Sequence, residues 1–488
     1  MPAAATPTEM PLLAKFAADL RQGDAATALR AGLIGEDVML EGPFGRQPLV
    51  YADYAASGRA LMQVERFILE EVLPYYANSH TQASFCGGYV TRLRREARAA
   101  IGRCCGAGAE HAVIFAGSGA TAGINRLVNL FGIPQAVAAG AVARVIIGPY
   151  EHHSNILAWR ESGAEVVEIP EAPAGGVDMA AFDAALARPA PAGPLVCSFS
   201  AASNVTGIVA DVCAITRRAK AAGAKMIWDY AGGGAYMRIA MNPEPAAAID
   251  AVVVSPHKFI GGPGASGVLI VRRDAVVSDR PTWPGGGTVR FVSPSAHDYA
   301  TSVEAREEAG TPNVIGDIRA ALAFLAKEAL GETRIAARNL ELADRAILEW
   351  RTVENLELLG SLTAQRLPIF SFRIRDGRGG YVHHQLVTRM LSDRFGIQAR
   401  GGCACAGPYV HRLLGIGEEQ SARIRADILA GRELEKPGFC RLNFSVLMSD
   451  AKVGYILDAV KQIAAGAAAD VGCYEGDPAS AIFTHKAA

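Results

Sequence analysis

The sequence predicts an α/β fold, with a large domain on a mostly parallel, seven-stranded sheet and a smaller α+β domain after it. Two observations indicate this. Seven short apolar runs lie between residues 112 and 271, and helical stretches alternate with them, as in βαβ units. After the turn at Gly310-Thr311-Pro312, the pattern changes to long helical runs with isolated strands. Ligands of such a sheet gather at the carboxyl ends of its parallel strands.

The chain is expected to begin with a helical arm over residues 1–45, since apolar residues recur at helical spacing before a Gly-rich turn. These residues are Leu12, Leu13, Phe16, Ala17 and Leu20, and the turn holds Gly42 and Gly45. The large domain is assigned to residues 46–305. Its predicted strands are Ala112–Phe115, Val142–Ile147, Val166–Ile169, Leu195–Phe199, Lys225–Trp228, Ala251–Val254 and Val268–Val271. Its predicted helices include Ser154–Glu161, Met179–Ala187 and Ala214–Ala222.

The small domain is assigned to residues 306–488. Helical runs are predicted at Val314–Ala329 and Ile335–Trp350, strands near Leu367–Arg373 and Arg441–Phe444, and a closing helix near Val453–Ala464. No internal repeat is evident.

Composition excludes several classes of protein. The 488 residues are 50% hydrophobic and 20% charged, as in ordinary globular proteins. A formal net charge of -1 gives no basic field for nucleic acid or for an anionic membrane. The first ten residues lack a basic segment followed by an apolar one, and no run approaches the ~20 apolar residues of a membrane helix. We therefore expect a cytoplasmic protein whose partners are small molecules or other proteins.

The nine cysteines are an odd number and form no Cys-x-x-Cys module, so most are expected to be reduced thiols in the core. His152 and His153 are adjacent, but neighbouring histidines seldom share a metal, and no cysteine or carboxylate cluster completes a site. No metal is expected.

Lys258 is the first candidate catalytic residue. It follows the apolar strand that ends at Ser255 and precedes the glycines Gly261, Gly262 and Gly264, so it should be held on a rigid strand end. Partial burial lowers the pKa of a lysine and frees the amine to form an imine with a carbonyl. The alternative is a solvated surface lysine.

A phosphate site is predicted at residues 116–123, Ala-Gly-Ser-Gly-Ala-Thr-Ala-Gly, which follow a strand and open a helix. The backbone amides around Ala120 and the Thr121 hydroxyl lie where a helix attracts anions. The segment lacks the Gly-Lys-Ser/Thr ending of a nucleotide P-loop and the dinucleotide spacing. A monophosphate is therefore the better hypothesis.

Three further strand ends carry polar side chains. Asp229 ends a strand and could keep a pyridine nitrogen protonated; the alternative is a turn cap. His152 could stack on the face of a ring, and Asn204 could bond a ring hydroxyl or serve as an ordinary turn residue.

The segment from Arg400 to Cys405 joins a guanidinium, suited to carboxylates, to two thiols on a Gly-rich loop. Without other cysteines at ligand spacing, a nucleophilic thiol is favoured over a metal or disulfide pair. Cys403 and Cys405 are two residues apart on a loop predicted to be extended, so they should share a face.

These motifs resemble those of class V aminotransferase-fold, pyridoxal-phosphate-dependent enzymes of the cysteine desulfurase and selenocysteine lyase group, over about residues 50–465. The matching segments are Tyr51 to Ser57, Glu151 to Asn155, Gly285 to Thr288, Arg306 to Asn313 and Arg400 to Cys405. The resemblance implies an aspartate aminotransferase-like fold (fold type I), the cofactor pyridoxal 5'-phosphate (PLP), and a homodimer.

The resemblance also implies roles for single residues. Lys258 is the Schiff-base lysine, Cys405 the sulfur-accepting cysteine, and His152 the stacking and catalytic histidine. Arg400, with Asn204, binds the substrate, and Thr288 reaches the partner subunit's phosphate. The implied cofactor contacts are Ala120, Thr121, His152, Asn204, Asp229, Ser255, His257, Lys258 and Thr288.

The sequence departs from the family at Gly232, where relatives carry a glutamine that bonds the cofactor hydroxyl. The molybdenum cofactor sulfurase branch also lacks that glutamine and has an Arg-x-Gly-Cys-x-Cys loop. A second departure is an extra segment, Tyr409 to Gly438, with a charged helix at Glu418–Arg425.

The expected function is removal of sulfur or selenium from L-cysteine or selenocysteine, which gives alanine and an enzyme persulfide. A protein that accepts the sulfur would be a further partner. Two alternatives stay open: another class V reaction (C–S lyase, epimerase or aminotransferase) and a scaffold subunit without turnover. The intact Lys258 and Asp229 argue against the scaffold.

Overall fold

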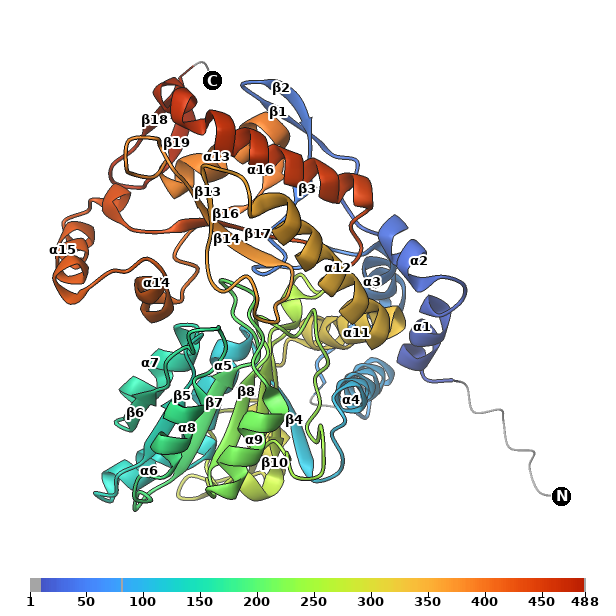
Figure 1. Cartoon of the computed structure of the whole chain (residues 1–488). Coiled ribbons are helices and arrows are strands. Elements are labelled where there is room, and N and C mark those ends of the chain that lie inside the picture. The colour runs from blue at the N-terminus through green and yellow to red at the C-terminus, as the bar shows by residue number, and fades with distance from the viewer. Residues whose placement is uncertain (1–9, 80–81, 487–488) are drawn as a thin grey trace.

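The structure is a computed structural model, and it describes residues 10–79 and 82–486. Residues 1–9, in which no targeting segment is expected, lie outside the described residues. Figure 1 shows the large sheet in the lower half of the molecule and a smaller sheet, covered by α12, α13 and α16, in the upper half. No helix of the described residues is long and apolar enough to cross a membrane.

The large sheet has seven strands in the order β4-β10-β9-β8-β7-β5-β6. All neighbours are parallel except β10, which is antiparallel to both β4 and β9. The strands are β4 (His111–Phe115), β5 (Arg144–Ile147), β6 (Glu165–Glu168), β7 (Leu195–Ser200), β8 (Lys225–Asp229), β9 (Ala251–Val254) and β10 (Val268–Arg272). The predicted mostly parallel sheet is confirmed, and each predicted strand agrees to within two residues.

The strand β9 shows why this sheet is buried on both faces. Its four residues are all fully buried, and successive side chains point to opposite faces. Val252 and Val254 join one apolar cluster, with helices α8 and α9, whereas Ala251 and Val253 join another, with helices α5 and α7. The alternation therefore serves two cores, which is why the run is continuously apolar.

Several helices flank the large sheet or lie beside it. They are α4 (Phe85–Cys104), α5 (Ala120–Leu130), α6 (Ile133–Ala138), α7 (Ser154–Glu161), α8 (Met179–Leu186), α9 (Val212–Ala221), α10 (Val303–Glu307) and α11 (Val314–Leu330). The helix α4 was not predicted, although its buried Val90, Leu93, Ala97 and Ile101 recur at helical spacing.

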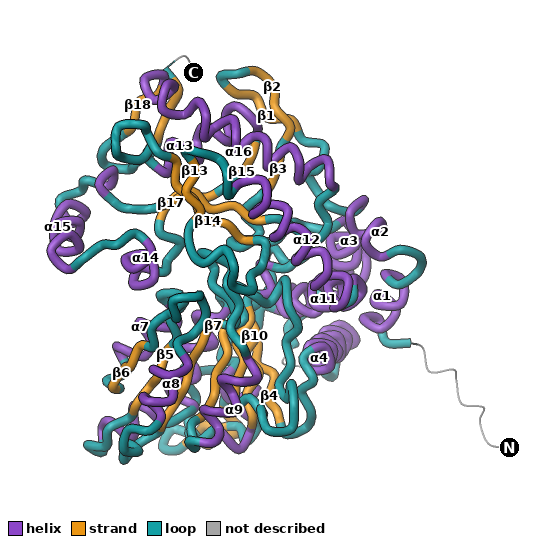
Figure 2. The backbone as a smooth tube through the Cα atoms, in the orientation of Figure 1, coloured by secondary structure: helices purple, strands orange, loops and turns teal. Residues whose placement is uncertain are grey.

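The second sheet has four antiparallel strands in the order β13-β14-β17-β16, and Figure 2 shows it beside the long helices of the upper half. The strands are β13 (Leu356–Leu358), β14 (Ile369–Ile374), β16 (Arg400–Gly402) and β17 (Phe439–Asn443). The helices are α12 (Glu332–Trp350), α13 (His384–Phe395) and α16 (Asp450–Asp470). These elements enclose a separate apolar cluster around Trp350 and Phe370.

The N-terminal region holds α1 (Leu12–Leu20), α2 (Ala25–Ala31) and α3 (Met62–Phe67). Between them, β1 (Met39–Gly42) and β2 (Gly45–Pro48) form a hairpin, whose turn is the predicted Gly-rich turn. The short strand β3 (Val50–Tyr51) pairs with β15 (Ile397–Gln398), so segments far apart in the sequence lie side by side.

The extra segment after Cys405 forms α14 (Gly407–Leu413) and α15 (Glu418–Leu429). The predicted charged helix is confirmed, and α15 contains no buried residue. In Figure 1 it projects from the side of the molecule, beyond α14. The remaining strands are β11 (Val289–Val292) with β12 (His297–Tyr299), and β18 (Tyr474–Gly476) with β19 (Phe483–His485).

Candidate active site

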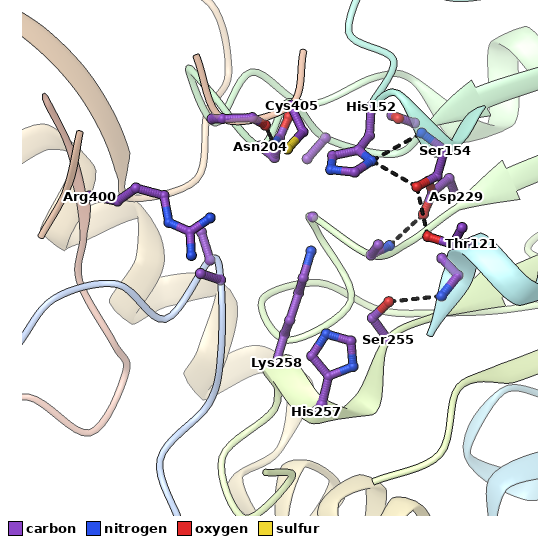
Figure 3. A pocket seen from close by; sticks show the side chains of 18 of the residues that line it. Thr121, His152, Ser154, Asn204, Asp229, Ser255, His257, Lys258, Arg400 and Cys405 are labelled. Carbon is purple, nitrogen blue, oxygen red and sulfur yellow. Dashed lines mark hydrogen bonds between the residues drawn. The ribbon is translucent and has the colours of Figure 1, made fainter. Parts of the chain in front are cut away.

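A cavity of about 230 Å³ lies at the carboxyl ends of the parallel strands, where an α/β sheet binds its ligands. Figure 3 shows Lys258 pointing into it, with Arg400 on one side and His152, Asp229 and Thr121 on the other. Of the predicted site residues, Ala120, Thr121, His152, Asn204, Asp229, Ser255, His257, Lys258, Arg400 and Cys405 all line this cavity. Thr288 does not, and its hydroxyl donates to the Gly285 carbonyl, 2.6 Å away.

Lys258 reaches the cavity from a short 3-10 turn, Pro256–Lys258, that follows β9. Its backbone N–H donates to the Ser255 carbonyl at 3.0 Å, which fixes the turn. Burial lowers the pKa of Lys258 to about 8, with Asp229 opposing that shift. The lysine is therefore much closer to a neutral, nucleophilic amine at neutral pH than a surface lysine is.

Asp229 is the last residue of β8 and is only 3% exposed. One carboxylate oxygen, Oδ1, accepts the backbone N–H of Ala231 at 2.7 Å. Burial raises the pKa of Asp229, while the Ala231 bond and Lys258 oppose the rise. A buried carboxylate at a cavity wall is stabilised by a cationic partner, and a protonated pyridine nitrogen is one.

An anion cradle lies at the start of α5. Its N-cap, Gly119, has φ of 79° and offers no side-chain cap to the first helical amides. A Cβ there would lie 2.8 Å from Ser255 Oγ and 2.9 Å from His257 Cε1, so only glycine fits. Ser255 Oγ accepts the Ala120 N–H at 3.0 Å, and Thr121 Oγ1 lies 2.7 Å from Ser154 Oγ. The helix N-terminus and these hydroxyls form a donor set for a phosphate.

The tautomer of His152 follows from its contacts. The Ser154 N–H donates to His152 Nδ1 at 3.2 Å, so that nitrogen carries no proton. Burial and the nearby Lys258 lower the pKa of His152 to about 4. The ring is therefore neutral at pH 7, with its proton on Nε2.

Asn204 and Gly232 lie together on the cavity wall. Asn204 Nδ2 donates to the Ala404 carbonyl at 2.8 Å, and Oδ1 is buried without a partner in the described residues. A Cβ at Gly232 would lie 2.9 Å from the Ala202 carbonyl and 3.5 Å from Asn204 Cβ. The glutamine of relatives therefore does not fit here without a backbone shift, and Asn204 Oδ1 is an available acceptor for a ring hydroxyl.

Arg441 is a site residue that the sequence reasoning missed. It lies directly opposite Arg400 in the β16–β17 ladder, and like charges in that position repel. Asp53 relieves the repulsion, since its Oδ1 is 2.8 Å from Arg441 Nη2 and its Oδ2 is 3.1 Å from Arg400 Nε. Arg441 lines the cavity although its side chain is only 3% exposed. The sequence could have pointed to Arg441, because it is a charged residue within the buried strand Phe439–Asn443.

The cysteine loop is not extended, contrary to prediction. Ala404 and Cys405 have left-handed φ values of 49° and 55°, which L-residues seldom adopt. Cys403 consequently packs against an apolar cluster, whereas Cys405 is exposed and lines the cavity. The two thiols do not share a face.

Three hydrogen bonds tie the cysteine loop to the large-domain side of the cavity. The His153 N–H donates to the Cys405 carbonyl at 2.8 Å, the Gly407 N–H donates to His153 Nε2 at 2.9 Å, and Asn204 donates to Ala404. These bonds hold the strained backbone in place. In the described residues, no group of three or more His, Cys, Asp or Glu side chains is arranged to hold a metal ion.

Comparison with known proteins adds the family. The model of the aminotransferase class-V family matches residues 50–453. A cysteine desulfurase of Serratia proteamaculans is 30% identical over 75% of this chain and 86% of its own length. One from Enterobacter sp. (strain 638) is 31% identical over 74% and 86%.

Two solved structures share the fold. The apo cysteine desulfurase of Thermococcus onnurineus superposes with a TM-score of 0.70 at 23% identity, over 86% of this chain and 95% of that one. The cysteine desulfurase CsdA of Escherichia coli gives 0.68 at 22% identity, over 90% and 98%. The predicted fold type I architecture is thus confirmed. The chain resembles cysteine desulfurases within its family, and it belongs to the class-V aminotransferases, a family of PLP-dependent enzymes.

Proposed function

We propose that the protein is a PLP-dependent cysteine desulfurase, which removes sulfur from L-cysteine, or selenium from selenocysteine, and leaves alanine and a persulfide on Cys405. The observation that carries the proposal is that the Cys405 side chain lines the same cavity as Lys258, Asp229 and Arg400. An exposed thiol beside an amino-acid site is needed for sulfur transfer, whereas lyase, epimerase and aminotransferase chemistry needs none. The names of the relatives support the same activity.

The cavity fits PLP in its donor set. We propose that Lys258 holds the aldehyde carbon, Asp229 the ring nitrogen, Asn204 the ring hydroxyl and His152 the ring face. Ala120, Thr121, Ser255 and His257 would hold the phosphate, together with Thr288 of the partner subunit. When bound, PLP supplies an electron sink for the charge left at a substrate Cα that has lost its proton.

The residues of the chain would divide the remaining tasks. Arg400 and Arg441 present two guanidinium groups for the substrate carboxylate, and Asp53 fixes both. Lys258, with its pKa near 8, takes the proton from Cα and can return it. Neutral His152 presents its Nε2–H to the reacting centre.

Sulfur transfer would follow at Cys405. Its thiolate attacks the substrate sulfur, the S–S bond forms, and the Cβ–S bond breaks with its electron pair going to carbon. A proton then replaces sulfur on Cβ, so that cysteine and one thiol give alanine and one persulfide. No external oxidant or reductant is needed.

The test is a pair of matched variants. Cys405→Ser is expected to abolish alanine release from cysteine in a single turnover, while borohydride still fixes the cofactor on the Lys258 peptide. Cys403→Ser, whose side chain is packed in the apolar cluster, should retain turnover. Undiminished alanine release by Cys405→Ser would instead assign the site to a class V reaction that uses no thiol.

We further propose a homodimer. Exposed apolar side chains lie on and beside the β11–β12 hairpin, near Thr288, and include Trp283, Phe291 and Val292. A second copy would cover such a patch, and light scattering would test whether the dimer forms.

We also propose a protein partner that accepts the persulfide sulfur, and a cytoplasmic location. The nine free thiols are typical of a reducing compartment. We also propose the arm, large domain and small domain as units, divided near residues 45 and 305.

A further inference from the structure

A second cavity, of about 690 Å³, is lined by no residue of the cysteine loop. It lies between the start of α12, the segment after β8 and the segment before β14. Its walls are largely apolar and include Val209, Met237, Ile335, Ala336, Leu340 and Leu367. A cavity of this size with few polar groups is typical of small-molecule sites, and no step proposed above uses it.

Lys327 lines this cavity. Its ammonium donates to the carbonyls of Gly234 at 2.6 Å and Met237 at 2.5 Å and lies 5.4 Å from the centre of the Phe259 ring. Among the described residues, no carboxylate comes within ion-pair distance of it. Burial lowers the pKa of Lys327 to about 8. A buried cation held only by neutral groups is poorly stabilised.

Arg366 is a second such cation among the residues that line this cavity. Its guanidinium donates to the carbonyls of Thr206, Ile369 and Ser361, and Nε is buried without a partner in the part of the chain that the structure describes. It too forms no ion pair there. Burial lowers the pKa of Arg366 to about 10.

The charges around the cavity leave a positive excess. Glu332 is its one carboxylate among the described lining residues, and that group lies 3.7 Å from Arg238 at the exposed rim. Glu332 also opposes the lowering of the Lys327 pKa from a distance, but among the described residues neither Lys327 nor Arg366 has a carboxylate in direct contact. Because most of their N–H groups are already used by carbonyls, little donor capacity remains, which suits one carboxylate better than a phosphate dianion.

We propose that this cavity, which we call the rear site, binds a medium-chain monocarboxylate. The carboxylate would lie at Lys327, within the field of Arg366, and the hydrocarbon tail along Ile335, Leu340 and Leu367. The rear site is adjacent to the active site, because a small cavity of about 30 Å³ is lined by both Lys258 and Lys327. The proposal is independent of the reaction at Cys405.

Octanoate is the probe, titrated by calorimetry into the cofactor-loaded enzyme, with 1-octanol and acetate as controls. Octanoate should bind at least about tenfold more tightly than either, because only it has both the charge and the apolar tail. Equal binding of octanoate and octanol would refute the charge requirement. If octanoate does not bind at concentrations up to about 10 mM, the site is refuted, because a dissociation constant above that value corresponds to little binding free energy.

A matched pair of variants on α12 locates the site. Leu340 is 59% exposed and lines the cavity, whereas Leu348 is 63% exposed and does not. Leu340→Glu should weaken octanoate binding about tenfold by like-charge repulsion and lost apolar contact, and Leu348→Glu should not. Equal affinities of the two variants would overturn the proposal and point instead to the active-site arginines. Lys327→Met should also weaken binding about tenfold, and the leucine pair decides if that variant does not fold.

Discussion

The two walls of the active site are built differently. The residues of the strand wall lie at or just after the ends of buried strands or in the first turn of a helix. They are Thr121, His152, Asp229, Ser255 and Lys258. The loop wall, formed by Arg400, Ala404 and Cys405, lies at the edge of the small sheet and has two left-handed residues. The Asp229 side chain is nearly buried, whereas that of Arg400 is 48% exposed. The residues proposed to hold the cofactor thus have a rigid support, while those proposed for the substrate and its sulfur lie where the chain is open to solvent.

The largest effect should come from the strand wall. Lys258→Ala is expected to lower turnover about 10⁴-fold, as loss of a catalytic base and nucleophile does. Its free energy of unfolding should not fall, because the change removes a buried amine. Single-turnover kinetics and urea denaturation measure the two quantities. A large loss of stability with retained turnover would reverse the comparison.

The paired arginines separate the two walls more finely. Arg441→Gln should cost about 3 kcal/mol of stability, since Asp53 loses a buried partner, and lower kcat/KM. Arg400→Gln should change stability by less than about 1 kcal/mol, since its ion pair is solvent-exposed, and raise KM. Urea titration beside steady-state kinetics checks both. Equal stability losses would show that exposure does not distinguish the walls.

The pH dependence of stability tests the burial of Lys258. In protein stripped of cofactor, its pKa is about 8, against an ordinary value of 10.5, so the unfolded chain binds more protons between these values. The buried lysine therefore lowers the free energy of unfolding by about 3 kcal/mol. This loss is complete below pH 8 and disappears as the pH rises toward 10.5. Lys258→Met should therefore exceed wild type in stability most at pH 7. A constant difference from pH 7 to pH 10 would show that the lysine is not buried.

Gly232→Gln should destabilise the fold by about 1–3 kcal/mol, because the new Cβ meets the Ala202 carbonyl. Restoring the glutamine of relatives is therefore not expected to improve activity. Gly472→Gln is the matched control, since a Cβ there meets nothing within 4 Å. Thermal denaturation of both variants would measure the difference, and an unchanged midpoint for Gly232→Gln would mean that the loop adapts.

The sequence predicted the strand wall well and the loop wall less well, for physical reasons. Apolar runs with β-branched residues form strands wherever they are buried, so the ends that carry Asp229 and Lys258 could be located. The helix at Ser154–Glu161 was predicted to the residue. The left-handed turn at Ala404 and Cys405 depends on hydrogen bonds to Asn204 and His153, which are distant in sequence. Arg441 was missed because its partner, Asp53, lies 388 residues away.

That long separation has a consequence for synthesis. Asp53 leaves the ribosome long before Arg400 and Arg441, its partners 347 and 388 residues later. At the ~5–20 residues per second of translation, the interval is roughly 20 to 80 seconds. During that time Asp53 has no cation from the small sheet, and β3 has no β15 to pair with. The nascent chain can therefore complete the large sheet before Arg400 and Arg441 are available to line the cavity. A chain whose synthesis ends before residue 441 would have the strands of the large sheet but an incomplete cavity.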